Sequence, residues 1–190
     1  MADCATIHRM SLTLRAGRLG LWCVAFVGAS GCAIAQSPAR ADQDSCRRFV
    51  QAFYDWYAPL TQKETNAPSW ERALREKRDA FAPALRQALE NDARAQAQAQ
   101  GDIVGIDFDP FLGSQDPAAH YRVRQVTVQG GKCSAGITNA AAELIYTNGL
   151  WRFTDFRYPE LKTDLTTVLA QTADERRKAH PSAAPTSKKW

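Results

Sequence analysis

The spacing of apolar residues changes near the middle of the chain, and this change limits the fold more than any other feature. In the first half, apolar residues recur every three or four positions, as on one face of a helix. In the second half, residues 121–124 and 126–128 alternate between apolar and polar, as in half-buried strands. Helices followed by strands predict an α+β fold, with N-terminal helices packed on a bent antiparallel sheet. The first helical run consists of Cys46, Phe49, Val50, Phe53, Trp56 and Tyr57.

Local signals set the expected ends of the helices. Asp44 or Ser45 can cap the first helix, because either side chain can accept a hydrogen bond from an exposed backbone N–H. Pro59 should end this helix soon after its last apolar residue. A second helix is expected over residues 70–80, and Pro83 suits the first turn of a third.

In the second half, turn residues and one shift in the apolar–polar alternation indicate where strands bend and end. The alternation slips by one residue at Gln125–Val126, which predicts a β-bulge and a bent strand. The pair Gly130-Gly131 predicts one turn, and Asn148-Gly149 between two apolar runs predicts a tight hairpin. A short final helix is expected over 161–169, followed from residue 173 by a charged, disordered tail.

Residues 1–35 are expected to be an export signal. Arg15 and Arg18 precede an apolar run over residues 19–27, which small residues follow. The apolar run is roughly ten residues long, whereas a membrane-spanning helix needs about 20, so a transmembrane anchor is disfavoured. Met1 and Met10 are both candidate translation starts, and a start at Met10 would give a more typical signal peptide.

Two ways of processing the signal compete. Residues 29–32 resemble a lipobox, in which Cys32 would carry a lipid, although Ala29 stands where leucine is usual. Residues 33–35 instead fit the A-x-A pattern of ordinary signal peptidase, which would leave Gln36 as the mature terminus. The protein is therefore expected in the periplasm or anchored to a membrane by lipid. The lipid anchor is the only contact with a membrane that we expect.

The exported part has the size of one domain. We expect a tether over 36–43, a single α+β domain over 44–172 and the tail over 173–190. Three of the 24 basic residues and one of the 20 acidic residues lie in the signal, which leaves 21 against 19. A net charge this close to zero, together with export, argues against nucleic acid as a partner.

Two of the five cysteines, Cys46 and Cys133, fall in the expected domain. An even pair in an oxidising compartment predicts a disulfide. It would close a loop of roughly 87 residues and stabilise the fold by about 4 kcal/mol in the chain-entropy model. Two separately buried thiols are the alternative.

Three segments together resemble a known family. They are residues 49–57, with an F-Y-x-W-Y pattern, residues 109–116, with D-P-F-x-x-x-Q-D, and residues 150–153 followed by Tyr158. The resemblance is to an exported bacterial family of unknown function in the nuclear-transport-factor-two-like (cystatin-like) superfamily. It implies a cone-shaped α+β domain with an internal pocket. Members of the wider group include isomerases, dehydratases and non-catalytic binding domains, so the resemblance does not name an activity.

The loop around residue 109 is the best candidate for a binding site. Asp109, Gln115, Asp116 and Tyr121 are the candidate ligand-binding residues. A calcium-binding loop is disfavoured, because apolar residues follow Asp109 where ligands and a glycine are needed. The aspartates also favour turns where they precede proline, which is the structural alternative. His120 is the single histidine of the expected domain, so a zinc site built on several histidines is excluded, and no cofactor is predicted.

An enzymatic alternative uses tyrosine and aspartate. In ketosteroid isomerase an aspartate base works with a tyrosine and a protonated aspartate. Here Tyr54 or Tyr57 with Asp107 or Asp109 could form a similar group, which would require a pocket carboxylate with a raised pKa. The tyrosines could equally be core aromatic residues whose hydroxyl groups reach the surface.

The sequence predicts a whole α+β domain but contains no recognisable catalytic motif, which favours a binding function. We expect a non-catalytic exported domain of the bacterial cell envelope, which binds an unidentified protein or a small apolar ligand. An immunity or inhibitor protein against a secreted toxin is one version of this hypothesis, and the pocket enzyme is the rival. A homodimer through the outer face of the sheet is left open.

Overall fold

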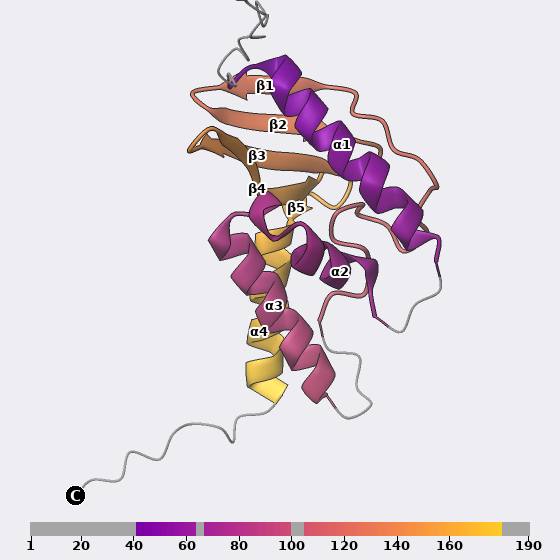
Figure 1. Cartoon of the computed structure of the whole chain (residues 1–190). Helices are drawn as coiled ribbons and strands as arrows, with labels where there is room; N and C mark the ends of the chain where they lie inside the picture. Colours follow the sequence, from indigo (N-terminus) through magenta and orange to yellow (C-terminus); the bar gives the residue numbers. More distant parts are fainter. Residues whose placement is uncertain (1–40, 64–66, 100–104, 180–190) are drawn as a thin grey trace, which may run out of the picture. The chain divides into compact units, whose positions relative to one another are not determined.

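A computed structural model of the chain describes residues 41–63, 67–99 and 105–179, all within one compact unit. The predictions on the export signal, Cys32 and the start at Met10 lie outside these residues. Figure 1 shows the elements, which follow one another in the expected order of helices and then strands. They are α1 (Gln43–Thr61), α2 (Ser69–Glu76), the 3-10 turn η1 (Arg78–Ala80), α3 (Pro83–Gln98), β1 (Val126–Gln129), β2 (Lys132–Gly136), β3 (Ala141–Thr147), β4 (Leu150–Tyr158), β5 (Thr163–Asp164) and α4 (Leu165–Ala179).

Helix α1 starts earlier and ends later than the sequence predicted. Its N-cap is Asp42, whose side chain accepts the Ser45 N–H at 2.8 Å while Ser45 Oγ accepts the Asp42 N–H at 3.1 Å. The expected cap at Asp44 or Ser45 is therefore wrong, because this reciprocal pair satisfies two N–H groups at once. Pro59 also does not end the helix promptly. It lies in the last turn, and the helix continues to Thr61.

The second expected helix is divided. Helix α2 ends at Glu76, and Lys77 leaves helical geometry with φ −119° before η1 begins. The break lets the chain turn so that Phe81 and Ala82 reach the sheet, where the Ala82 N–H bonds to Phe153 O at 2.8 Å. The expected start of a third helix at Pro83 is confirmed.

The five strands form one antiparallel sheet in the order β1-β2-β3-β4-β5. Both predicted turns are present. Asn148 and Gly149 have φ values of 53° and 79°, as a type I′ hairpin requires, and Gly130 and Gly131 are also left-handed. The α+β class predicted from the sequence is thus confirmed.

The predicted slip in the first strand is present next to β1. Arg124 and Gln125 are both exposed, and both oppose Gly136. The Arg124 N–H donates to Gly136 O at 2.9 Å, while the Gly136 N–H donates to Gln125 O at 2.8 Å. Two residues opposite one is the pattern of a β-bulge. A second shift, which the sequence did not predict, lies between β3 and β4, where Glu143 pairs with Asp155 and Leu144 with Phe153.

The core lies between α1 and one face of the sheet. Its centre is Phe53 of α1, whose ring lies 4.8 Å from that of Phe153 and 5.7 Å from that of Phe111. The disulfide predicted from the sequence is confirmed. Cys46 of α1 and Cys133 of β2 are joined in this core with their Cα atoms 6.7 Å apart.

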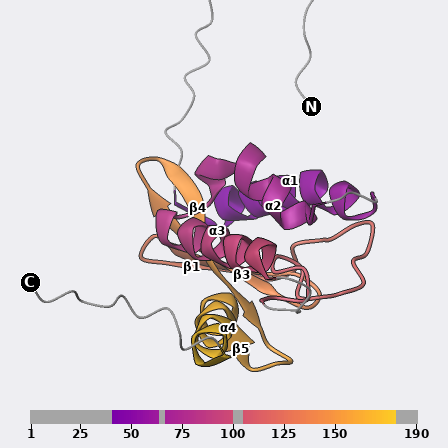
Figure 2. The same ribbon diagram turned by 90° about the horizontal axis from the view of Figure 1, so that it is seen from below.

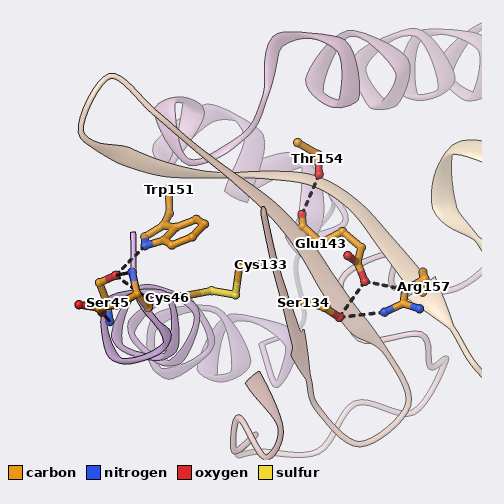
Figure 3. The surroundings of a disulfide bond; sticks show 9 residues. Ser45, Cys46, Cys133, Ser134, Glu143, Trp151, Thr154 and Arg157 are labelled. Atoms are coloured by element: carbon orange, nitrogen blue, oxygen red, sulfur yellow. Dashed lines mark hydrogen bonds and ion pairs between the residues drawn. A yellow bond between two sulfur atoms is a disulfide. The ribbon is translucent and has the colours of Figure 1, made fainter. Parts of the chain in front are cut away.

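Figure 3 shows how the disulfide relates to the two faces of the sheet. On the α1 side, Trp151 Nε1–H donates to Ser45 Oγ at 3.1 Å. Ser134, Glu143 and Arg157 form a polar group on the opposite face, where Arg157 pairs with Glu143 at 2.5 Å.

Helix α4 corrects the expected C-terminal boundary. It begins at Leu165 rather than near Leu161, which is exposed, and it continues to Ala179. Residues 173–179 are therefore helical, so the prediction of a disordered tail from residue 173 is wrong for this stretch. Residues 180–190 lie outside the described part. Figure 2 shows α4 with β5 on the side opposite α1 and α2. Among the described residues, no helix is both long and apolar enough to cross a membrane.

Candidate functional site

The loop over residues 109–114 is closed by hydrogen bonds of its own backbone. The Asp109 N–H donates to Ser114 O at 3.0 Å, and the Gly113 N–H donates to Asp109 O at 2.9 Å. Asp109 Oδ1 accepts the N–H groups of Phe111 and Leu112 at 3.0 and 3.2 Å. Aspartate favours such turns because its short carboxylate reaches the backbone two or three residues further on. Phe111 and Leu112 are thereby directed fully into the core.

Three tyrosine hydroxyl groups hold this loop against the core. Tyr54 of α1 donates to Phe111 O at 2.8 Å, and Tyr57 of α1 donates to Asp109 Oδ2 at 2.5 Å. Tyr158, the last residue of β4, donates to Pro110 O at 2.7 Å. We call Tyr54, Tyr57 and Tyr158 the tyrosine latch. Because both α1 and β4 contribute to the latch, the loop is fixed to two elements that are distant in sequence.

Burial controls the ionisation of these groups. It raises the pKa of Asp109 from 3.8 to about 6, although hydrogen bonds from Tyr57, Phe111 and Leu112 oppose the rise. Burial, and then the nearby Asp109 charge, raise the pKa of Tyr54 and of Tyr57 well above 10. The same two causes raise the pKa of Tyr158. The latch hydroxyl groups therefore stay protonated and remain hydrogen-bond donors.

An open pocket of about 450 Å³ lies beside the latched loop. Of the described residues that line it, Asp107 and Asp109 are charged, and Trp70 and Phe108 are aromatic. A pocket whose described lining combines carboxylates with aromatic rings and includes no lysine or arginine is suited to a positively charged group. The other lining residues are Thr61, Pro68, Ser69, Gln96, Ile106, Ser114, Gln115 and Pro117.

The structure brings together part of the site expected from the sequence. Asp107, Asp109 and Gln115 share the pocket, and Gln115 Nε2 lies 3.3 Å from Asp107 Oδ2. Asp116 is exposed next to the pocket but does not line it. Tyr121 lies elsewhere: its hydroxyl accepts the Ala118 N–H at 2.8 Å, and it lines a separate depression.

The tyrosines of the enzymatic hypothesis lie behind the pocket wall. Neither Tyr54 nor Tyr57 lines the pocket, although the Tyr57 hydroxyl reaches it through Asp109. Sequence analysis missed Trp70, Gln96 and Phe108 as pocket residues. Trp70 showed only core-type helical spacing, and no local pattern could have placed α2 beside a loop some 40 positions later. Within the described residues, no group of three or more His, Cys, Asp or Glu side chains could hold a metal ion.

Comparison with known proteins shows only a partial similarity. No family model and no curated protein sequence matches the chain. Two solved structures of the type VI effector–immunity complex Tae3-Tai3 from Ralstonia pickettii each contain a chain with a similar arrangement of the backbone. The native complex aligns with a TM-score of 0.40 and 18% identity over 58% of this chain and 92% of that one. For the selenomethionine form the TM-score is 0.38, the identity 19% and the coverage 59% and 94%. Membership of the nuclear-transport-factor-two-like superfamily stays a prediction.

Proposed function

We propose that this protein is an exported binding domain of the cell envelope, and that its pocket receives a lysine or arginine side chain of a partner protein. One observation carries the proposal. Among the described residues, the charged lining of the pocket consists of Asp107 and Asp109, which share it with Trp70 and Phe108. A small apolar ligand, the other partner class expected from the sequence, would supply no positive charge to these two carboxylates, which have only neutral hydrogen-bond donors among the described residues.

The chemistry of the pocket explains why a cationic side chain would bind. A carboxylate forms stronger hydrogen bonds with an ammonium or guanidinium group than with a neutral donor. A cation over an aromatic face gains a further ~0.5–2 kcal/mol, and more where water is excluded. Because the tyrosine latch already holds the loop that carries Asp109, little ordering free energy is lost when a partner binds.

Export has its own support. The disulfide between Cys46 and Cys133 is typical of an oxidising compartment such as the periplasm. We propose that the signal over residues 1–35 delivers the protein there. Attachment of lipid at Cys32, against cleavage before Gln36, is decided by the mass of the mature N-terminal peptide.

Crosslinking in intact cells tests the binding proposal. A photoreactive benzoylphenylalanine replaces exposed Gln115 at the pocket rim or, as a control site, exposed Gln129 at the end of β1. We expect one protein to crosslink at position 115 and not at position 129. Asp107→Asn should weaken this product, whereas the matched Asp44→Asn should not, because Asp44 lies at the opposite end of α1 from the pocket residue Thr61. No product at position 115, or equal products at both positions, would contradict the proposal.

The identity of the crosslinked protein distinguishes the versions of the proposal. If the partner is a secreted toxin, its enzymatic activity should fall when the purified domain is added, as the immunity hypothesis requires. A partner with unchanged activity would leave binding established and remove the immunity version.

A second candidate function is acid–base catalysis by Asp109. The supporting observation is that burial raises the pKa of this pocket carboxylate to about 6, close to the range in which general bases work. Its two oxygens are, however, engaged by Tyr57 and by two backbone N–H groups, so proton transfer would require the latch to open. Incubation with small molecules from an envelope extract tests this candidate. It requires a product that wild type forms and Asp109→Asn does not, and an unchanged extract would oppose it.

A further inference from the structure

We propose that Arg176 of α4 is a positioning residue for the pocket. Through this residue, α4 determines where the pocket-wall residues Gln96 and Ile106 lie, although no residue of α4 lines the pocket. The functional meaning of this inference rests on the proposed binding function, whereas its structural part can be tested without any partner. It follows from one buried carboxylate, Asp92 of α3.

Asp92 connects α4 to α3. Its side chain is almost completely buried, and Asp92 Oδ1 accepts a hydrogen bond from Arg176 Nη1 at 2.6 Å. The Arg176 side chain is itself only 18% exposed, unlike the next residue, Arg177, whose side chain is 76% exposed and pairs with Asp174 on the same helix. The Asp92–Arg176 pair is therefore sheltered from water, where an ion pair with good geometry is weakened little by solvent.

The other oxygen of Asp92 holds the pocket wall. Asp92 Oδ2 accepts Gln96 Nε2–H at 2.8 Å and the Ile106 N–H at 3.3 Å. Gln96 and Ile106 both line the pocket, and Ile106 directly precedes Asp107. One carboxylate thus joins α4 on one side to the start of the segment that carries Asp107 and Asp109 on the other.

Gly105 shows how closely this wall is fitted. Its φ is +115°, a conformation that other residues rarely adopt, and a Cβ added here would lie 2.5 Å from Gln96 Nε2. The backbone therefore approaches the Gln96 side chain directly before Ile106 donates to Asp92. A movement of the Asp92 carboxylate would therefore change its hydrogen bonds to both Gln96 and Ile106.

Loss of the arginine should release the wall. Without Arg176, the donors to the buried carboxylate among the described residues are the neutral Gln96 and Ile106 groups, and a buried charge without its partner is strongly unfavourable. The carboxylate then gains by turning toward water on the α4 side, which weakens its bonds to Gln96 and Ile106. Helix α4 itself stays attached through buried Leu165 and Leu169, so the effect concentrates at the wall.

Amide hydrogen exchange measured by NMR on the purified protein tests the structural part. In Arg176→Gln, the Ile106 amide should exchange about tenfold faster than in wild type, while a core amide such as Val50 changes much less. Arg176→Lys should restore most of the protection, because a lysine can still donate to Asp92 Oδ1. Arg177→Gln, which removes an exposed arginine from the neighbouring position, should have no effect. Unchanged exchange at Ile106, or equal acceleration at Ile106 and Val50, would overturn the inference.

A second variant reaches the same contacts from the other side. Gly105→Ala places a methyl group against Gln96 and strains the backbone at φ +115°, in both cases without touching α4. It should also speed exchange at Ile106 if the wall is held as described. This variant keeps the inference falsifiable if Arg176→Gln does not fold. Unchanged exchange in folded Gly105→Ala would count against it.

Binding of a defined probe connects the wall to the function. We expect N-acetyl-arginine methylamide to bind wild type and Arg177→Gln alike, and Arg176→Gln about fivefold more weakly, since a displaced wall moves the carboxylates from their positions. N-acetyl-norleucine methylamide is the uncharged control. If the arginine probe fails to bind wild type, the cationic-ligand proposal fails, and hydrogen exchange alone decides the role of Arg176. If it binds wild type and Arg176→Gln equally, the positioning role fails and the pocket chemistry stands.

Discussion

The half-buried carboxylate of Asp109 should make the folded protein less stable as the pH rises from about 4 to about 7. Burial raises its pKa from 3.8 to about 6, so between these values the folded state binds more protons than the unfolded state. The free energy of unfolding must then decrease with increasing pH. This contribution is fully present below pH 3.8 and is lost once the pH has passed through the folded pKa of about 6. The direction is opposite to that of the usual ion-paired aspartate.

The size of the effect follows from the two pKa values. Each pKa unit corresponds to about 1.4 kcal/mol, so the rise from 3.8 to about 6 sets an upper bound of about 3 kcal/mol. Asp109 is half-buried and lines an open pocket, so solvent screening reduces the expected value to about 2 kcal/mol. Asp109→Asn removes the charge and keeps an oxygen for the N–H groups of Phe111 and Leu112. The difference in stability between wild type and this variant therefore isolates the carboxylate.

Urea unfolding of both proteins at four pH values between 4 and 7 measures this difference. Wild type should lose about 2 kcal/mol relative to Asp109→Asn across the range. Tyr57→Phe provides an internal control on the cause. The Tyr57 hydroxyl lowers the pKa of Asp109, so its removal should make the pH dependence steeper. A difference between wild type and Asp109→Asn that is flat, or that moves in favour of wild type with rising pH, would refute the reasoning.

Three further predictions concern stability. Replacing both Cys46 and Cys133 by alanine should lower the free energy of unfolding by about 4 kcal/mol, because the disulfide closes a loop of 87 residues. Equal urea midpoints for this variant and wild type would contradict the prediction. Tyr158→Phe should cost about 1–3 kcal/mol, since it leaves the buried Pro110 carbonyl without its donor, and a cost below 0.5 kcal/mol by urea unfolding would mean that water replaces the hydroxyl. Gly149→Ala should cost about 1 kcal/mol in the same assay, because alanine resists the left-handed conformation at φ 79°, and an unchanged midpoint would show that the turn relaxes.

The features that the sequence predicted well are those that a few neighbouring residues decide. Asn148 and Gly149 favour their turn whatever surrounds it, and the one-residue slip at Gln125 shows in the pattern because it changes which side chains are buried. Helix ends were predicted less well. The reciprocal bonds between Asp42 and Ser45 win over the neighbouring candidate at Asp44, and local sequence offers several caps of similar strength.

The candidate site was predicted only where it lies within one loop. Asp107, Asp109 and Gln115 were found from the sequence because they are close along the chain. Trp70 and Gln96 join them through tertiary contacts between α2, α3 and the loop, which periodicity within each helix cannot reveal. For the same reason, the connection from Arg176 through Asp92 to the wall has no signal in the sequence: 84 residues separate the two partners.

The tyrosine latch joins residues from the segments on which the sequence resemblance rests. These segments are residues 49–57, 109–116 and 150–153 followed by Tyr158. Tyr54 and Tyr57 from the first and Tyr158 after the third bond to the loop that the second contains. Their polar atoms there bond to one another, so they determine how the loop is held. The chemistry presented to a partner depends instead on the exposed side chains of Asp107, just outside these segments, and Gln115 near the end of one. A domain built in this way can change its partner through a few rim residues while the latch, and with it the fold of the loop, is kept.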